Sequence, residues 1–402
     1  MKMNEHVKKI SVLIGVGFVD MLGFAMIFPL LPFYALRLNA EEWVIGWMIA
    51  SFSIAQLAAA PLWGRFSDKF GRRPALIAGL AGSAIAFVVF GYAVTIWMLF
   101  LSRIIQGAGG GTTGVAQAYI GDAVPPKERA KALGWLSAAT SAGVMIGPAI
   151  GSLATNLGHE APGLIAAGLC LLNMLFAWRW LPETKPRNRD GQAGQALGPG
   201  AAVAVRSIRE TLWEVIRSPN GDVPKLIWIY AVGMLGFMSM TGVLALYLES
   251  DFGVTEKTIG LFFVYVGALS VVMRALILGK LVDWLGEAKV MRLGAISLTL
   301  GLVLLPLPHS VLLLAPVISL IPVGTALLFP SVTALVTHKA PDHERGQVLG
   351  VQQTFGGIAR VIAPIWATAV FQGWGTGVPF YIAAGVVAGV TLLAFRVRPD
   401  GR

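Results

Sequence analysis

Long apolar stretches alternate with short polar segments along most of the chain, and residues 74–102 contain no charged side chain. About 20 apolar residues in a helix cross the hydrocarbon core of a bilayer. Transmembrane β-strands would instead show polar and apolar residues in strict alternation over short segments, and the sequence lacks that alternation. The pattern therefore predicts membrane-spanning helices.

Twelve spans of this length fit into the chain. Turn-forming residues divide the longest apolar runs at 91–93 and at 306–309. The predicted spans cover residues 8–36, 43–64, 74–93, 96–121, 129–155, 161–181, 223–248, 257–280, 289–307, 310–338, 345–371 and 377–395. The sequence thus predicts an all-α integral membrane protein with 12 transmembrane helices.

Composition and charge support this fold class. Hydrophobic residues make up 56% of the chain, charged residues 13%, and the mean hydropathy is +0.72. With the N-terminus in the cytoplasm, 26 of the 31 Lys and Arg lie in cytoplasmic segments, and Arg37 and Lys257 lie outside. We therefore expect both termini in the cytoplasm. The net charge of +10 reflects this topology and a lipid bilayer environment rather than a nucleic-acid partner.

The sequence lacks the residues that several kinds of chemistry require. The single Cys170 excludes a disulfide or a cysteine metal site within one chain, and we expect it to be a small buried side chain. No cluster of His, Asp and Glu suggests a metal, and the glycines of 107–114 lack the Gly-Lys-Ser/Thr ending of a phosphate-binding loop. We expect no metal, no cofactor and no enzymatic activity.

The chain contains an internal repeat. The glycines and the aspartate of GRFSDKFGRRP (64–74) recur in GKLVDWLGEAK (279–289), displaced by 215 residues. VPPKERAKALG (124–134) returns as APDHERGQVLG (340–350), displaced by 216. The chain therefore divides into two related six-helix halves joined by a polar cytoplasmic linker, with predicted boundaries at 1–182, 183–222 and 223–402.

The second part of the linker is amphipathic. Apolar residues share one helical face of 205–217, namely Val205, Ile208, Leu212, Val215 and Ile216. This pattern predicts a helix at the inner membrane surface, and docking onto the protein is the alternative.

Four motifs together resemble the major facilitator superfamily. GRFSDKFGRRP resembles the family's loop between helices 2 and 3, and SRIIQGAGGG (102–111) resembles its helix 4 motif. GVMIGPAIG (143–151) resembles the helix 5 motif of the antiporter branch. DMLGFAMIFPLLP (20–32) looks like helix 1 of tetracycline and multidrug proton antiporters. The resemblance covers the whole chain and implies two pseudo-symmetric halves.

The resemblance also implies a function. We expect a monomeric secondary transporter of the bacterial inner membrane, without a cofactor, which uses the proton gradient to export a small organic compound. The compound would be tetracycline or a range of lipophilic drugs. The alternative is a proton-coupled metabolite or sugar transporter of the same fold.

Asp20 and Arg103 are the candidate proton-coupling residues. Asp20 is the one acid predicted near the middle of a span, and burial penalises the charged form of a carboxyl. In the family, the helix 4 arginine is thought to influence protonation of a helix 1 carboxylate, which would join Arg103 to Asp20. The alternatives are a structural Asp20 and an Arg103 that bonds to Gln106 or to backbone carbonyls.

The resemblance assigns gating to the charged loop and close packing to helix 5. Asp68, Arg72 and Asp122 would form a cytoplasmic gating network, although the loop could also serve as a topological signal alone. The predicted gating residues are Gly64, Asp68, Gly71, Arg72, Arg73 and Asp122. The helix 4 motif consists of Arg103, Gln106 and Gly107. Glycines every four residues on helix 5 would seal it against helix 8, with Gly143, Gly147, Pro148 and Gly151 forming the motif.

No short motif encodes a substrate pocket. Aromatic walls and hydrogen-bonding side chains are expected around a cavity, although each such residue could equally serve in packing. The candidate cavity residues are Phe24, Phe28, Gln56, Gln117, Tyr247, Gln352, Gln353 and Arg360. Arg274 could face the cavity or reach lipid headgroups.

Overall fold

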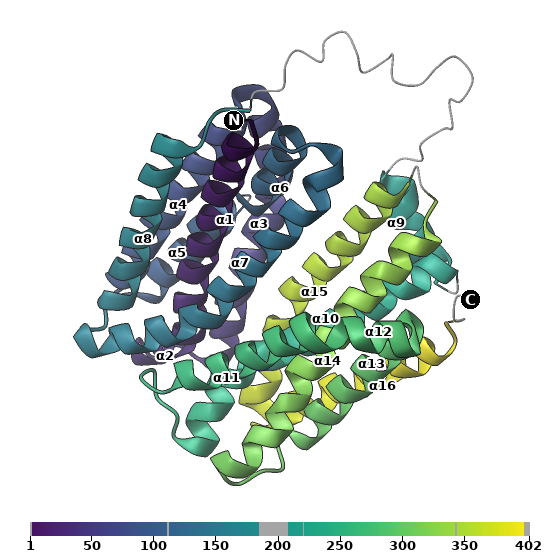
Figure 1. Ribbon diagram of the computed structural model, residues 1–402. Coiled ribbons are helices and arrows are strands. Elements are labelled where there is room, and N and C mark those ends of the chain that lie inside the picture. The colour runs from purple at the N-terminus through teal and green to yellow at the C-terminus, as the bar shows by residue number, and fades with distance from the viewer. Residues whose placement is uncertain (1, 111, 185–207, 220, 342–343, 398–402) are drawn as a thin grey trace. The chain divides into compact units, whose positions relative to one another are not determined.

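The computed structural model describes the chain except for residues 1, 111, 185–207, 220, 342–343 and 398–402. The described residues form helices and no strand (Figure 1). This confirms the predicted all-α class.

The helices of the first half follow the predicted spans closely. The first span bends through a short 3₁₀ turn at Pro29 and remains helical to Arg37. The elements are α1 (Lys2–Ile27), η1 (Phe28–Leu30), α2 (Leu31–Arg37), α3 (Glu42–Phe70), α4 (Arg72–Gly91), α5 (Ile96–Gly109), α6 (Thr112–Ala123), α7 (Pro126–Ala154), η2 (Thr155–Leu157) and α8 (Ala161–Trp180).

The second half begins with a short helix and then repeats the pattern of long ones. A π-helical turn, η3, interrupts one of them at Arg274. The elements are α9 (Ile208–Arg217), α10 (Asp222–Phe252), α11 (Ile259–Val272), η3 (Met273–Ile277), α12 (Leu278–Leu285), α13 (Glu287–Leu304), α14 (Val311–Lys339), α15 (Arg345–Trp374) and α16 (Val378–Phe395).

Ten helical segments of the described chain are long and apolar enough to cross a membrane. The chain is therefore a multi-pass membrane protein. Two predicted spans are not among the ten. One is divided into α5 and α6, and the other, α13, has 18 residues and carries Glu287, Lys289 and Arg292 in its first turns. The total of twelve and the orientation of the termini stay predictions.

The described chain divides into two compact units. The first contains residues 1–40, 51–203 and 255–264, and the second contains 41–50, 204–254 and 265–402. The two short segments, 41–50 and 255–264, are thus grouped with the opposite half of the sequence from the one in which they lie.

The same packing pattern occurs in each unit. In the first, α1 packs against α7 and α8, and α4 packs against α5 and α8. In the second, α10 packs against α15 and α16, and α13 packs against α14 and α16 (Figure 1). Each helix pair of the first unit thus has a counterpart about 215 residues later, as expected for the sequence repeat.

The charged stretch 64–74 differs from the expected loop. α3 continues through it to Phe70 and α4 begins at Arg72, so Gly71 alone breaks the helix. Gly71 has φ +108°, a conformation that a side chain strongly disfavours. The charged residues therefore lie on helix ends, whose backbone positions are fixed.

The linker helix is present over its described part. α9 packs against α10 and α15, and Thr211 and Val215 are buried. Gln347 on α15 donates to the Thr211 hydroxyl at 2.6 Å, and the Trp228 indole donates to the Val215 carbonyl at 3.0 Å. The structure therefore shows α9 docked onto the protein, which is the alternative given from the sequence. Residues 205–207 of the predicted helix lie outside the described residues.

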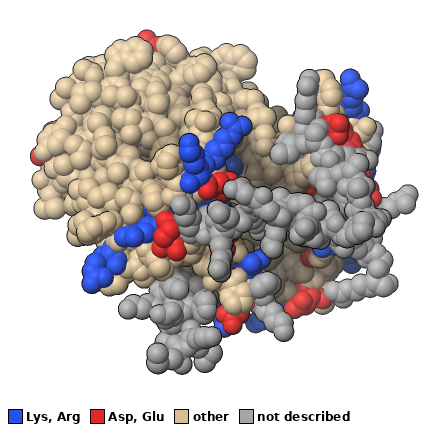
Figure 2. All heavy atoms as spheres, turned by 90° about the horizontal axis from the view of Figure 1, so that it is seen from above, with Lys and Arg blue, Asp and Glu red and all other residues tan. Residues whose placement is uncertain are grey.

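Charged side chains are unevenly distributed over the surface. In the view from above, Lys, Arg, Asp and Glu appear in several small groups, and a broad part of the visible surface is uncharged (Figure 2). Uncharged surface of this extent is expected where lipid chains surround a membrane protein.

Candidate functional site

Asp20 lies in the first unit, where α1 meets α6. The Thr112 hydroxyl donates to its carboxylate oxygen Oδ2 at 2.9 Å. A cavity of about 20 Å³ adjoins the pair and is also lined by Gly17, Leu136 and Thr140. This volume accommodates about one water molecule. The carboxyl group therefore sits in a confined niche where a few polar side chains lie among mostly apolar ones.

Arg103 is almost completely buried on α5, with 1% of its surface exposed. Its guanidinium donates to Oε1 of Gln106 and lies over two aromatic rings, 4.7 Å from the centroid of Phe52 and 5.7 Å from that of Phe24. Its buried Nε has no hydrogen-bond partner among the described residues. Aromatic faces stabilise a cation without neutralising it, so the arginine keeps its charge at this depth.

The predicted unit of Arg103 and Asp20 is not formed in this structure. Within the described residues, Asp20 bonds to Thr112 and Arg103 bonds to Gln106, and no ion pair joins the two charges. Phe24 and Phe52, whose ring centroids are 5.1 Å apart, pack beside the guanidinium. The alternative partner proposed from the sequence, Gln106, is the one observed.

The glycines of the helix 5 motif pack closely against α1. A Cβ atom placed on Gly143 would lie 2.5 Å from the carbonyl oxygen of Phe18, and one placed on Gly147 would lie 2.7 Å from that of Leu22. Both carbonyls belong to α1. The predicted close contact is present, and for Gly143 and Gly147 the neighbour is α1. The predicted helix 8, which begins with α11 (Ile259–Val272), meets the same helix, α7, at Pro148. Glycines at every fourth position form one row along α7, and α1 packs closely against that row.

The first turn of α11 instead meets α7 through Gly260. The Gly260 amide donates to the Ser152 hydroxyl at 2.8 Å, and a Cβ there would lie 2.5 Å from the Pro148 carbonyl oxygen. The second unit repeats this contact. A Cβ placed on Gly46 of α3 would lie 2.5 Å from the Pro364 carbonyl oxygen of α15 and closer still to the Thr368 hydroxyl. The repeat thus preserves a glycine contact as well as the helices.

Arg72 is the centre of the charged turn. Its side chain lies 2.9 Å from Asp122 and 2.7 Å from Asp68, and it donates to the Ser67 hydroxyl at 2.9 Å. The predicted pairing of Arg72 with both acids is therefore present, while its role in gating stays a prediction. Gly64 lies within α3, and a Cβ there would meet no atom within 4 Å.

Two partners of this turn were not identified from the sequence. Glu183 accepts the backbone N–H of Arg72 at 2.9 Å and so caps the start of α4. Arg73 donates to the Trp178 carbonyl of α8. Glu183 is the first residue of the predicted linker, 111 residues from its partner, and no local pattern relates it to a helix start at that distance.

The candidate cavity residues lie in both units, four in the first and four in the second. In the first unit, Phe24 of α1 stacks on Phe28 of η1, Gln56 donates to the Gly110 carbonyl at 3.4 Å, and Gln117 is exposed. Gly107 of the helix 4 motif packs against the Phe52 backbone. In the second unit, three candidates bond within the protein, namely Gln352 to Thr333 at 2.9 Å, Gln353 to Tyr230 at 3.4 Å and Arg360 to the Gly356 carbonyl at 3.3 Å.

Tyr247 is a packing residue rather than a cavity residue. It is fully buried, its hydroxyl donates to the Leu305 carbonyl at 3.0 Å, and its ring packs against Phe252 and Phe380. A tyrosine with a satisfied hydroxyl inside a helix bundle has no surface left for a ligand. This corrects the prediction made from its aromatic character.

Two repeated helix units, a charged turn at Gly71 and close glycine contacts define a transporter fold. The family model of the Major Facilitator Superfamily matches residues 13–364 and, in a second match, 323–402. The chain belongs to this superfamily.

Curated relatives extend over almost the whole chain. The tetracycline resistance protein, class B, of Escherichia coli is 27% identical over 373 residues, which is 92% of this chain and 89% of that protein. Multidrug resistance protein 1 of Bacillus subtilis (strain 168) is 29% identical over 383 residues, which is 94% of this chain and 93% of that protein.

Solved structures show the same fold. The nucleoside transporter NupG has a TM-score of 0.78 at 16% identity, covering 96% of this chain and 99% of that one. The human organic anion transporter MFSD10 (TETRAN) has a TM-score of 0.70 at 22% identity, covering 97% and 99%. The chain is thus a transporter by family, and these solved structures share its fold.

Proposed function

We propose that this protein is a proton-coupled antiporter that exports a small organic compound, tetracycline or a range of lipophilic drugs, by alternating access. The observation that carries the proposal is the partly buried Asp20 carboxyl group, held by Thr112 beside a cavity of about one water. The names of the tetracycline and multidrug resistance relatives support a drug as the exported compound.

The proposed mechanism assigns a proton to Asp20. A carboxyl group in a niche with one hydroxyl partner can release its proton when water reaches it from one side and take one up from the other. Arg103 stays charged between its two aromatic rings, and its charge favours release of the proton when the helices rearrange. No cofactor is required, because the proton gradient supplies the energy. We place the protein in the inner membrane of a bacterium as a monomer.

Everted membrane vesicles provide the test. We expect tetracycline, or another member of a drug panel, to collapse a preformed proton gradient, and we expect Asp20→Asn to abolish this response in folded protein. Glu128→Gln is the matched control, because Glu128 is an exposed acid in the first turn of α7. Undiminished drug and proton exchange by Asp20→Asn would refute the role of Asp20.

A proton-coupled metabolite or sugar transporter is the alternative function. It predicts that no drug in the panel changes the gradient and that a sugar or metabolite does. In a symporter, the compound and the proton would also move in the same direction. The identity of the compound that changes the gradient therefore separates the two functions, and the direction of proton movement separates a symporter from an exporter.

A further inference from the structure

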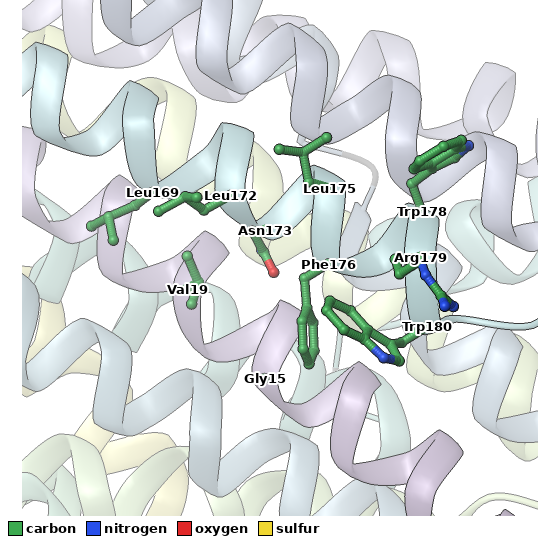
Figure 3. Close-up of a pocket in the computed structure, with 10 residues that line it drawn as sticks. All are labelled: Gly15, Val19, Leu169, Leu172, Asn173, Leu175, Phe176, Trp178, Arg179 and Trp180. Atoms are coloured by element: carbon green, nitrogen blue, oxygen red, sulfur yellow. The ribbon is translucent and has the colours of Figure 1, made fainter.

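A groove runs along the packed pair α1 and α8 in the first unit. It has a volume of about 620 Å³ and is lined by one short part of α1 and by the second half of α8 (Figure 3). Gly15 and Val19 form the α1 side, and residues between Leu169 and Trp180 form the α8 side. Neither Asp20 nor any residue of the charged turn lines it.

The groove exists because α1 lacks a side chain at Gly15. A Cβ atom placed there would meet no atom within 4 Å, so the position opens onto free space. Phe176 and Trp180, with ring centroids 4.7 Å apart, extend from α8 toward this turn of α1 (Figure 3). Asn173 donates to the Val16 carbonyl at 3.0 Å, which satisfies the amide at the floor. The groove is therefore long, open and apolar.

The walls of the groove lie in a membrane span. α8 is one of the ten candidate spans, and its side chains Leu172 and Leu175 are 65% and 52% exposed. In a bilayer such side chains contact lipid chains rather than water. An empty apolar groove would lose the van der Waals contacts of its lining, and an acyl chain is the flexible apolar segment that the surroundings supply.

One end of the groove is basic and aromatic. Arg179, in the last turn of α8, is exposed and lies 5.8 Å from the ring centroid of Trp180. Arg73 donates to the Trp178 carbonyl at the same end. Tryptophans with a neighbouring arginine are typical of the boundary between lipid chains and headgroups, and cations at this depth attract anionic headgroups.

We propose that this groove is a binding site for one anionic phospholipid. An acyl chain lies between α1 and α8 over Gly15, and the phosphate contacts the guanidinium of Arg179. No acidic side chain is among the residues that line the groove, so the charge at its end favours an anionic headgroup over a zwitterionic one. The proposal does not depend on the transported compound.

The headgroup half of the proposal is tested with the full-length protein purified in detergent. Native mass spectrometry would compare binding of phosphatidylglycerol and phosphatidylcholine with identical chains. We expect about fivefold tighter binding of phosphatidylglycerol, and loss of this preference in Arg179→Gln. Arg217→Gln is the matched control, because Arg217 also stacks on a tryptophan, Trp213, but lies on α9. A preference that survives Arg179→Gln, or that disappears equally in Arg217→Gln, overturns the proposal.

The chain half is tested by filling the groove. Gly15→Leu places a side chain where the acyl chain would lie, and we expect both lipids to bind about fivefold more weakly. Gly168→Leu is the control, since a Cβ at Gly168 also meets no atom within 4 Å but the residue does not line the groove. Unchanged binding by Gly15→Leu refutes the chain site. Displacement of phosphatidylglycerol by inorganic phosphate alone would show a simple anion site and would likewise overturn the proposal.

Discussion

The two units carry the same one-residue helix break, yet they surround it with different contacts. Gly71 separates α3 from α4, and Gly286 separates α12 from α13, with φ of +108° and +80° respectively. At the first break, Arg72 contacts Asp68, Asp122 and Ser67. At the second break, Glu287 contacts His338 at 3.1 Å.

The repeat relates these pairs directly. Glu287 lies 215 residues after Arg72, and His338 lies 216 residues after Asp122, so the helix positions are kept while the acidic and basic partners are exchanged. Asp283, the counterpart of Asp68, has no ion pair among the described residues. The backbone of the turn is thus common to both units, and the dense charge network belongs to the first. The backbone break is thus part of the repeated fold, and a role of the first network in gating stays a prediction.

Replacing the two glycines should give the largest effects. Both have a backbone conformation that a Cβ strongly disfavours, at a cost of about 1–3 kcal/mol. A Cβ on Gly71 would also lie 2.7 Å from the Glu183 carboxylate, whereas one on Gly286 would meet nothing within 4 Å. We expect Gly71→Ala to destabilise by about 3 kcal/mol and Gly286→Ala by about 2 kcal/mol.

Thermal unfolding in detergent would measure this difference. Gly64→Ala is the control, because Gly64 belongs to the same sequence motif but lies inside α3 with open space around it. Alanine should be neutral or slightly stabilising there. An unfolding temperature that falls equally in Gly64→Ala and Gly71→Ala would contradict the role of backbone conformation.

The second-largest difference is expected between substitutions in the charged contacts at the two helix breaks. Arg72→Gln leaves Asp68 and Asp122 without their cation, and each partly exposed pair is worth about 0–1 kcal/mol. If the network stabilises one state of the transport cycle, the rate of drug efflux should fall by up to about tenfold. Glu287→Gln should change the rate by less than about twofold, because glutamine can still bond to His338. Equal rates in both variants would show that the first network has no special role.

The sequence predicted much of the fold and part of the site. Apolar length identified the helices, and the repeat identified the paired units, because both depend on patterns along the chain. The pairing of Arg72 with Asp122 followed from the resemblance to the superfamily, whose gating network it matches. The helix break at Gly71 could not be predicted from the sequence. A run of charged residues is equally typical of a loop and of a helix end that extends into water.

Contacts between distant segments were the hardest to predict. Thr112 bonds to Asp20 across 92 residues, and Glu183 reaches Arg72 across 111. Neither contact leaves a local pattern. The helix 5 glycines showed that a neighbour must be close, but their spacing is the same for any helix that packs there, so α1 could not be told from helix 8.

The Glu183 cap offers a smaller test of the comparison. Glu183→Gln removes the negative charge at the start of α4 and weakens the bond to the Arg72 amide, at a cost of about 0.5–1 kcal/mol. Glu160→Gln is a suitable control, since Glu160 precedes α8 but its side chain makes no capping bond. The unfolding temperature should fall in Glu183→Gln and stay unchanged in Glu160→Gln. An equal decrease in both would indicate a general effect of lost charge.

The smallest expected effect comes from giving the second unit a permanent ion pair. The contact of His338 with Glu287 joins one imidazole nitrogen to the carboxylate. An arginine is permanently charged and can donate two hydrogen bonds to a carboxylate, so in His338→Arg we expect a gain of about 0–1 kcal/mol. His338→Gln keeps a donor without a charge and should not show this gain. The unfolding temperatures of the two variants would distinguish them. If His338→Arg also changed the rate of efflux as much as Arg72→Gln, the second turn would be a functional partner of the first rather than a structural copy of it.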